Sequence, residues 1–169
     1  MVGIEFDAVA ADSAREWCEE VIVGDVESVE LPVDLGTFDV ILCADIVEHL
    51  RDPESFLRRS RSLLRDDGIL VLSTPNVANW SIRASLLAGR FQYTSRGILD
   101  RTHTHLFTRR SLVECLEAAG YRVLDLDFTV PVPVVGTPAI EGAAYMVGRL
   151  RPTLFAYQFV VTAKVADCL

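Results

Sequence analysis

The sequence predicts an α/β domain built on a mostly parallel sheet. Apolar runs of strand length alternate with segments of helical periodicity, and the links between them are short. The chain has 169 residues, which is enough for one domain with a full core. No internal repeat and no second domain is visible, so we expect residues 1–169 to form a single domain.

The strands of the first half follow from short β-branched or aliphatic runs that end in acids, glycine or proline. They are expected at residues 2–6, at 21–23, from Phe38 to just before Asp45, and at 69–73. The run from Phe38 is apolar on both of its alternating faces, as in a strand buried within a parallel sheet.

Two helices are expected between these strands. The first begins at Asp12 or Ser13 and runs to about residue 20, with Trp17 among its inward residues. The second begins at Asp52-Pro53-Glu54, which supplies an N-cap, a proline at the first helical position and an acid in the first turn. It should run to about residue 65 and end before Asp67-Gly68.

The second half predicts two further helices and two strands. A helix over 79–92 would present one face made of Trp80, Leu86, Leu87 and Phe91. Thr108 caps a helix that Gly120 ends as a C′ residue. Strands follow at 121–130 and 155–165, separated by a proline-rich connection at 131–138 and a short helix at 142–150.

Composition and charge exclude several classes of protein. The net charge of −8 argues against a nucleic-acid binder, which would need a concentrated basic surface. No apolar run approaches the length of a membrane span, and no secretory signal follows Met1. The scattered Cys18, Cys43, Cys115 and Cys168 lack ligand spacing and indicate buried thiols in a reducing compartment. The cytoplasm is therefore the expected location.

Titratable side chains follow the strand that begins at Phe38. Asp45, Glu48 and His49 stand at i, i+3 and i+4, so one helical turn would point all three the same way. Ligands of open α/β sheets bind beyond the carboxyl ends of the strands, which makes this a candidate site. A solvated loop that caps or salt-bridges a helix is the competing interpretation.

The order of the motifs resembles the class I S-adenosylmethionine-dependent methyltransferases, in particular the small-molecule group of type 11 or type 23. The ordered set is GIEFD, GDV, FDVILCADIVEHL, DPESFL, DDGILVLSTPN, and DRTHTHLFTRRSL with AGY. The resemblance spans nearly the whole chain. It implies a Rossmann-like, mostly parallel sheet with helices on both faces and an antiparallel last strand.

The resemblance also implies a cofactor site for S-adenosylmethionine. Glu5 matches the acid that hydrogen-bonds the ribose hydroxyls, and a carboxylate is able to accept from both. Asp25 matches the acid facing the adenine amine, with Val26 beside the ring. The end of the next strand, Cys43, Ala44 and Asp45, matches the backbone that lies against the methionine part. Solvated strand-end acids and, for Val26, core packing are the alternatives.

On the acceptor side, Glu48 and His49 match the family's glutamate–histidine pair, and His103 matches a loop histidine. A histidine suits a general base that removes a proton from a hydroxyl acceptor. His103 as a hydrogen-bonded loop anchor is the alternative, and His105 stands where an arginine is more usual. A metal is possible at Glu48, His49 and His103, but their spacing in the sequence demands none, so no metal ligand is assigned.

One part of the family pattern is missing from this sequence. The chain contains no first strand and no GxGxG loop, which in the family come immediately before the segment that starts here at residue 1. We therefore expect a domain truncated at its N-terminus that binds the cofactor weakly. Three explanations stay open. The chain is the C-terminal portion of a longer enzyme, or the strands at residues 2 and 38 pair directly, or a partner chain supplies the missing strand.

The expected function is methyl transfer from S-adenosylmethionine to a small-molecule acceptor, most simply at oxygen. The arginine-bearing stretch 79–101 would suit a phosphorylated, sugar-linked or lipid-linked acceptor. The alternative is a non-catalytic interaction domain that pairs as a homodimer through an exposed sheet gap. A dinucleotide-binding oxidoreductase is disfavoured because its glycine fingerprint is also absent.

Overall fold

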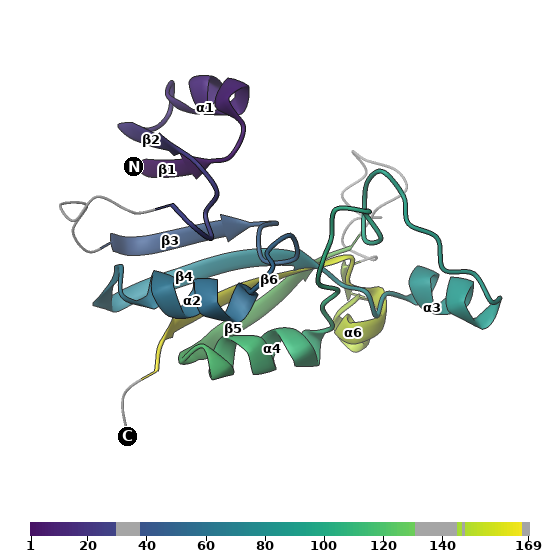
Figure 1. Ribbon diagram of the computed structural model, residues 1–169. Coiled ribbons are helices and arrows are strands. Elements are labelled where there is room, and N and C mark those ends of the chain that lie inside the picture. The colour runs from purple at the N-terminus through teal and green to yellow at the C-terminus, as the bar shows by residue number, and fades with distance from the viewer. Residues whose placement is uncertain (30–37, 131–144, 147, 167–169) are drawn as a thin grey trace. The chain divides into compact units, whose positions relative to one another are not determined.

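The computed structural model describes residues 1–29, 38–130, 145–146 and 148–166 (Figure 1). It contains two compact units, Met1–Gly36 and Thr37–Leu169, and each is described here by itself. The predicted connection at 131–138 and most of the predicted helix at 142–150 lie outside the described residues, although 145–146 and 148–150 are helical. That residues 1–169 form one domain stays a prediction.

The first unit is a β–α–β element. Strands β1 (Val2–Glu5) and β2 (Glu20–Val23) pair in parallel, as predicted, around helix α1 (Ala8–Ala14). The predicted start of this helix was wrong. Asp7 is the N-cap, because its carboxylate accepts from the amides of Val9 and Ala10 directly after the strand. The helix ends at Ala14, so Trp17 lies beyond it. Trp17 is exposed and not one of its inward residues.

The second unit is built around a four-stranded sheet in the order β3-β4-β6-β5. β3 pairs in parallel with β4, whereas β6 is antiparallel to both β4 and β5. Three strands thus share one direction and β6 runs against them, so the sheet is mixed and the predicted antiparallel last strand is confirmed. Its elements are β3 (Phe38–Ala44), α2 (Pro53–Arg61), β4 (Leu64–Pro75), α3 (Trp80–Leu87), α4 (Arg109–Ala118), β5 (Tyr121–Thr129), α6 (Pro152–Phe155) and β6 (Gln158–Val165).

Strand pairing assigns β1 and β3 to different sheets. The direct pairing of the strands at residues 2 and 38, one of the three explanations for the missing first strand, stays a prediction, because these strands belong to separate units.

Strand β4 begins earlier than its sequence predicts. The register steps from Phe38 opposite Leu64 to Val40 opposite Ile69, so the residues between Leu64 and Ile69 form a bulge within the strand. A Cβ on Gly68 would lie 3.0 Å from the carbonyl oxygen of Phe38. Asp67-Gly68 was expected to end the helix, but α2 already stops at Arg61 and the glycine permits the bulge.

The two faces of this sheet differ in burial. Leu70, Leu72 and Thr74 of β4 are fully buried on the face where α2 and α4 lie side by side (Figure 1). We call this the helix-covered face. The opposite face, called the open face, carries Val40 and Leu42 of β3, which are 52% and 69% exposed. Helices on both faces stay a prediction, because the described helices α2 and α4 cover one face only.

Helix α3 does not bury the face predicted for it. Asn79 caps the helix, as the predicted start at residue 79 implies, and Gly89 at φ 69° follows its end. None of its residues is buried, and Leu86 and Leu87 are 52% and 91% exposed. The sequence predicted one apolar face for this helix, and the large side chains of that face, Trp80, Leu86 and Leu87, are exposed.

Helix α4 and its ends match the prediction closely. Thr108 and Ser111 form a capping box, and Gly120 adopts φ 84° directly after the helix. Its Leu112 and Leu116 are buried on the helix-covered face. The last strand begins at Gln158 rather than 155, because Pro152 starts the short helix α6.

Candidate functional site

The carboxyl end of β3 is closed by Asp45, whose backbone is left-handed at φ 51°. Its amide donates to the Ser73 carbonyl oxygen at 3.2 Å. Its Oδ1 accepts from Ser73 Oγ at 3.1 Å and from Gln158 Nε2 at 2.6 Å. Ser73 lies between Leu72 and Thr74, whose side chains are on the helix-covered face, so its own side chain points to the open face. The network of Asp45, Ser73 and Gln158 therefore braces the strand ends on the open face.

Glu48 occupies the opposite side of the same strand ends. It lies in the turn after β3 and is only 1% exposed. Its Oε2 accepts from Thr74 Oγ1 at 3.1 Å, while its Oε1 is buried without a hydrogen-bond partner. Burial raises the pKa of this carboxyl group. A buried carboxylate oxygen without a donor is costly, and it marks a position that a ligand or a proton would complete.

The loop before α4 is clamped to the turn that carries Glu48. The amides of Thr104 and His105 donate to the Glu48 carbonyl oxygen at 2.8 and 3.0 Å. Thr104 Oγ1 donates to the Leu50 carbonyl oxygen at 2.6 Å, and His105 Nδ1 lies 3.0 Å from the same oxygen. These contacts hold His103 beside Glu48 although the two are far apart in sequence.

Both histidines of the site are oriented by backbone carbonyls. His49 Nδ1 lies 3.2 Å from the Thr102 carbonyl oxygen, and His103 Nδ1 lies 3.0 Å from that of Ile98. A carbonyl oxygen only accepts, so the proton of each neutral ring is assigned to Nδ1 and the lone pair to Nε2. The ring centroids are 4.8 Å apart at an interplanar angle of 75°.

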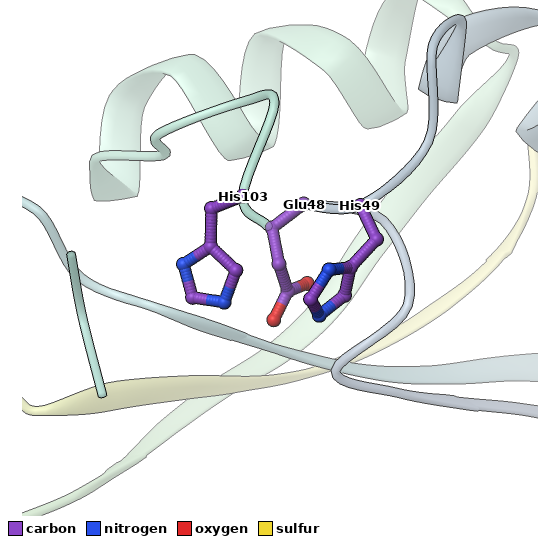
Figure 2. Close-up of side chains that lie close together, drawn as sticks. All are labelled: Glu48, His49 and His103. Carbon is purple, nitrogen blue, oxygen red and sulfur yellow. The ribbon is translucent and has the colours of Figure 1, made fainter. Parts of the chain in front are cut away.

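Glu48, His49 and His103 therefore form one cluster (Figure 2). One ligand atom from each lies within 4.8 Å of the other two. Glu48 is buried, His103 is intermediate and His49 is exposed, so the cluster runs from the interior to the surface. Two imidazole nitrogens and a carboxylate in this arrangement are able to exchange a proton with a bound hydroxyl or to hold a cation.

Asp45, Glu48 and His49 were expected to point the same way, but the structure separates Asp45 from the other two. Glu48 and His49 meet His103, whereas Asp45 joins Ser73 and Gln158 instead. The segment after β3 is a turn rather than a helix, so the i, i+3, i+4 argument was wrong for Asp45.

Cys43 and Ala44, the other residues predicted at the end of β3, differ in their exposure to solvent. Cys43 is 4% exposed on the helix-covered face, and burial raises the pKa of its thiol to about 12, so it is no nucleophile. Ala44 is exposed. His105 lies on the Leu50 carbonyl oxygen and is outside the cluster of Glu48, His49 and His103.

In the first unit, Glu5 and Asp25 lie at neighbouring ends of parallel strands. Glu5 ends β1 opposite Val23, and its Oε1 accepts from the Asp7 amide at 2.9 Å. Asp25 follows β2, and its Oδ1 accepts from the Glu27 amide at 2.9 Å. Both carboxylates are thus held at the edge where ligands of parallel sheets bind. Val26 is half-buried beside Asp25.

Sequence reasoning missed the residues that orient the site. Thr74 holds Glu48, Ser73 and Gln158 hold Asp45, and the carbonyl groups of Ile98 and Thr102 hold the histidines. The run ILVLST contained one usable signal, because alternation puts Ser73 and Thr74 on opposite faces at the strand end. No pattern in the sequence marks the two carbonyl groups.

Known proteins resemble this chain in sequence. Residues 1–126 match a family described as a methyltransferase domain. A probable S-adenosylmethionine-dependent methyltransferase of Mycolicibacterium smegmatis is 28% identical over 74% of this chain and 44% of its own length. The ubiquinone biosynthesis O-methyltransferase of Acinetobacter baylyi is 25% identical over 75% of this chain and 56% of its own length.

The fold is also found among solved structures. An S-adenosylmethionine-dependent methyltransferase from Clostridium acetobutylicum superposes with a TM-score of 0.61 at 10% identity, over 98% of this chain and 75% of that one. At this identity the likeness concerns the fold alone. In the part of the chain that the structure describes, no helix is long and apolar enough to cross a membrane.

The polar groups beyond the carboxyl ends of its strands place this chain in the class of open α/β ligand-binding folds. Within that class it belongs to the S-adenosylmethionine-dependent methyltransferase domain family, which the match over residues 1–126 shows. The chain spans about half the length of the curated relatives that it matches.

Proposed function

We propose that this chain takes part in methyl transfer from S-adenosylmethionine to a hydroxyl group of a small acceptor. The observation that carries the proposal is the cluster of Glu48, His49 and His103, with two oriented imidazole Nε2 atoms beyond the end of β3. The name of the Acinetobacter baylyi relative, an O-methyltransferase, supports oxygen as the atom methylated.

In this proposal the cofactor contacts come from strand ends. Glu5 accepts from the ribose hydroxyls and Asp25 from the adenine amine, with Val26 against the ring. The two carboxylates fit these donors, because local amide bonds already hold each of them at its strand end. The backbone of Cys43, Ala44 and Asp45 lies along the methionine part. The bound cofactor supplies a methyl group from a positively charged sulfur, and the rest of the cofactor leaves as a thioether.

The histidines act on the acceptor in this proposal. The hydroxyl oxygen forms the new bond to the methyl carbon, and its proton passes to Nε2 of His49 or His103. The backbone carbonyls on Nδ1 hold each ring so that Nε2 is the basic atom. Glu48, fixed by Thr74, lies beside both rings.

The acceptor is proposed to carry an apolar portion, such as a lipid-linked group. Helix α3 supports this, because it buries none of its side chains and exposes Trp80, Leu86 and Leu87. Arg83 and Arg90 lie in and next to the same helix and would suit a phosphate or sugar linkage.

The cofactor roles are tested by calorimetric titration of the chain with S-adenosylhomocysteine. We expect Glu5→Gln and Asp25→Asn each to weaken binding about tenfold or more, since a hydrogen bond to a charged group is worth about 1.5–3 kcal/mol. Asp12→Asn is the matched control, because the Asp12 carboxylate lies on α1 and pairs with Arg15 at the end of that helix. Equal affinities in all four proteins would contradict these roles.

A second candidate function is a non-catalytic interaction domain that forms a homodimer. It is favoured by one observation, the exposure of Val40, Leu42 and Leu124 on or beside the open face. Measuring the mass of the chain in solution by light scattering separates the two. A monomer across the accessible concentration range, together with cofactor binding, would contradict the interaction domain.

A further inference from the structure

We propose that Glu48, His49 and His103 form a binding site for one divalent transition-metal cation of the Zn²⁺ type. The spacing of these residues in the sequence demands no metal, because they are split between a turn and a distant loop. The geometry points to one, since the two segments bring one ligand atom of each residue within 4.8 Å of the other two (Figure 2).

The strongest observation is the free oxygen of Glu48. The side chain is 1% exposed, Thr74 satisfies Oε2, and Oε1 has no hydrogen-bond partner. Among the described residues of this unit, no other buried side-chain nitrogen or oxygen lacks a hydrogen-bond partner. Asn76 and Asn79, for example, both donate to the carbonyl oxygen of Ala156 and accept from nearby amides. The fold satisfies these amides but leaves one carboxylate oxygen of Glu48 without a donor beside two imidazoles. A cation bound among the three side chains would satisfy that oxygen.

The second observation is the orientation of the rings. Histidines that bind metals nearly always donate their other ring N–H to a carbonyl or a carboxylate. Both do so here, His49 to Thr102 at 3.2 Å and His103 to Ile98 at 3.0 Å. Each ring therefore presents an unprotonated Nε2, the form that binds a cation without first losing a proton.

The ligand set selects the class of cation. Two imidazoles and one carboxylate suit Zn²⁺ and its first-row neighbours, whereas Mg²⁺ prefers oxygen ligands alone. Three protein ligands leave a position of the cation open for water or another oxygen. The exposure of His49 puts that position on the solvent side of the cluster.

The spacing requires a small closure on binding. Two ligand atoms on one tetrahedral Zn²⁺ lie roughly 3.3 Å apart, because each Zn–N bond is about 2.0–2.1 Å. The three atoms here lie within 4.8 Å of one another. A shift of about 1 Å closes the set, and rotation of the exposed His49 ring is able to supply much of it.

The cation would change the proton chemistry proposed above, and this step alone rests on the proposed function. With both Nε2 lone pairs bound to the metal, neither ring accepts the acceptor's proton. An acceptor hydroxyl on the open position instead loses its proton more readily to water, because a cation lowers the pKa of a bound oxygen.

The test is metal binding by the whole chain, measured by calorimetry with Zn²⁺ and by the visible absorption of bound Co²⁺. We expect one equivalent to bind, and His103→Ala and Glu48→Gln each to weaken binding more than about 100-fold, beyond the 10–100-fold typical of outer-shell changes. His105→Ala is the matched control. His105 lies on the same loop, its Nδ1 faces a carbonyl oxygen in the same way, and it is outside the cluster.

Thermal unfolding of each metal-free variant checks that the fold is retained. Should Glu48→Gln fail to fold, His49→Ala replaces it, because His49 is exposed. Equal Zn²⁺ affinity in wild type, His103→Ala and His105→Ala would overturn the site, as would Co²⁺ spectra showing thiolate ligation or Mg²⁺ binding as tightly as Zn²⁺. The cofactor titration with Glu5→Gln does not involve these residues, so the two proposals fail separately.

Discussion

The two faces of the four-stranded sheet end in two carboxylates that are three residues apart and behave in opposite ways. On the open face, Asp45 is exposed, yet its Oδ1 accepts from Ser73 and Gln158. On the helix-covered face, Glu48 is almost fully buried, yet its Oε1 has no partner. Solvent would satisfy the first carboxylate without any protein contact, whereas only the protein or a ligand is able to satisfy the second.

The two carboxylates therefore play different parts at the same sheet edge: Asp45 braces the strand ends, whereas Glu48 keeps one oxygen for a ligand. The contacts of Asp45 join β3, β4 and β6 and hold its left-handed backbone in place. The contacts of Glu48 leave one oxygen for something outside the chain. The sheet face on which a titratable residue lies is therefore a better guide to its role than its spacing in the sequence.

The largest expected effect contrasts the two faces directly. Leu70→Ala should lower the free energy of unfolding by about 2–5 kcal/mol, because Leu70 is fully buried and its removal leaves a cavity. Leu42→Ala, its matched control, should change it by no more than about 0.5 kcal/mol, because Leu42 is 69% exposed. Urea denaturation measures both, and equal losses would show that the open face is covered in solution.

The second prediction compares neighbouring residues of β4. Thr74→Val keeps the shape of a fully buried side chain but removes the donor to Glu48, so we expect a loss of about 1–3 kcal/mol in the free energy of unfolding. Ser73→Ala removes the hydrogen bonds of Ser73 Oγ with Asp45 and Gln158, which water is able to replace, and we expect about 1 kcal/mol or less.

A double mutant ties the larger loss to Glu48. In the Glu48→Gln background, Thr74→Val should cost less than in wild type, because the partner left behind is then neutral. Chemical denaturation of the four proteins of this cycle measures the coupling. An unchanged cost of Thr74→Val would mean that packing of Thr74, rather than its bond to Glu48, matters.

Much of the fold could be predicted because local chemistry decides it. Asp52-Pro53 starts α2, Thr108 and Gly120 bound α4, and apolar runs mark the strands. The failures have physical causes as well. Asp7 outcompeted Asp12 as a cap because it directly follows β1. The spacing of Trp80, Leu86 and Leu87 predicted one apolar face on α3 without deciding whether it is buried, because burial depends on a neighbouring element and periodicity says nothing of whether one is present.

The candidate site was predictable by residue type and not by arrangement. Glu48, His49 and His103 were singled out, but their meeting depends on the amides of Thr104 and His105 binding the Glu48 carbonyl oxygen. Backbone contacts of this kind involve no distinctive side chain. The separation of Asp45 from the cluster depends on its positive φ, which the sequence does not reveal for an aspartate.

The smallest expected effect concerns Asp45 itself and tests whether it only braces the strand end. Asp45→Ala removes the acceptor for Ser73 and Gln158 and puts a less tolerant residue at φ 51°, so the free energy of unfolding should fall by about 1 kcal/mol. Asp45→Asn keeps an acceptor oxygen and tolerates this backbone, so a few tenths of a kcal/mol, roughly, is expected. Neither substitution should alter Zn²⁺ affinity by more than about threefold, because a carboxylate on the open face acts on the cluster only through a solvent-screened charge. A loss of metal binding in Asp45→Asn as large as that in Glu48→Gln would contradict the division between the two faces and would make Asp45 a fourth ligand.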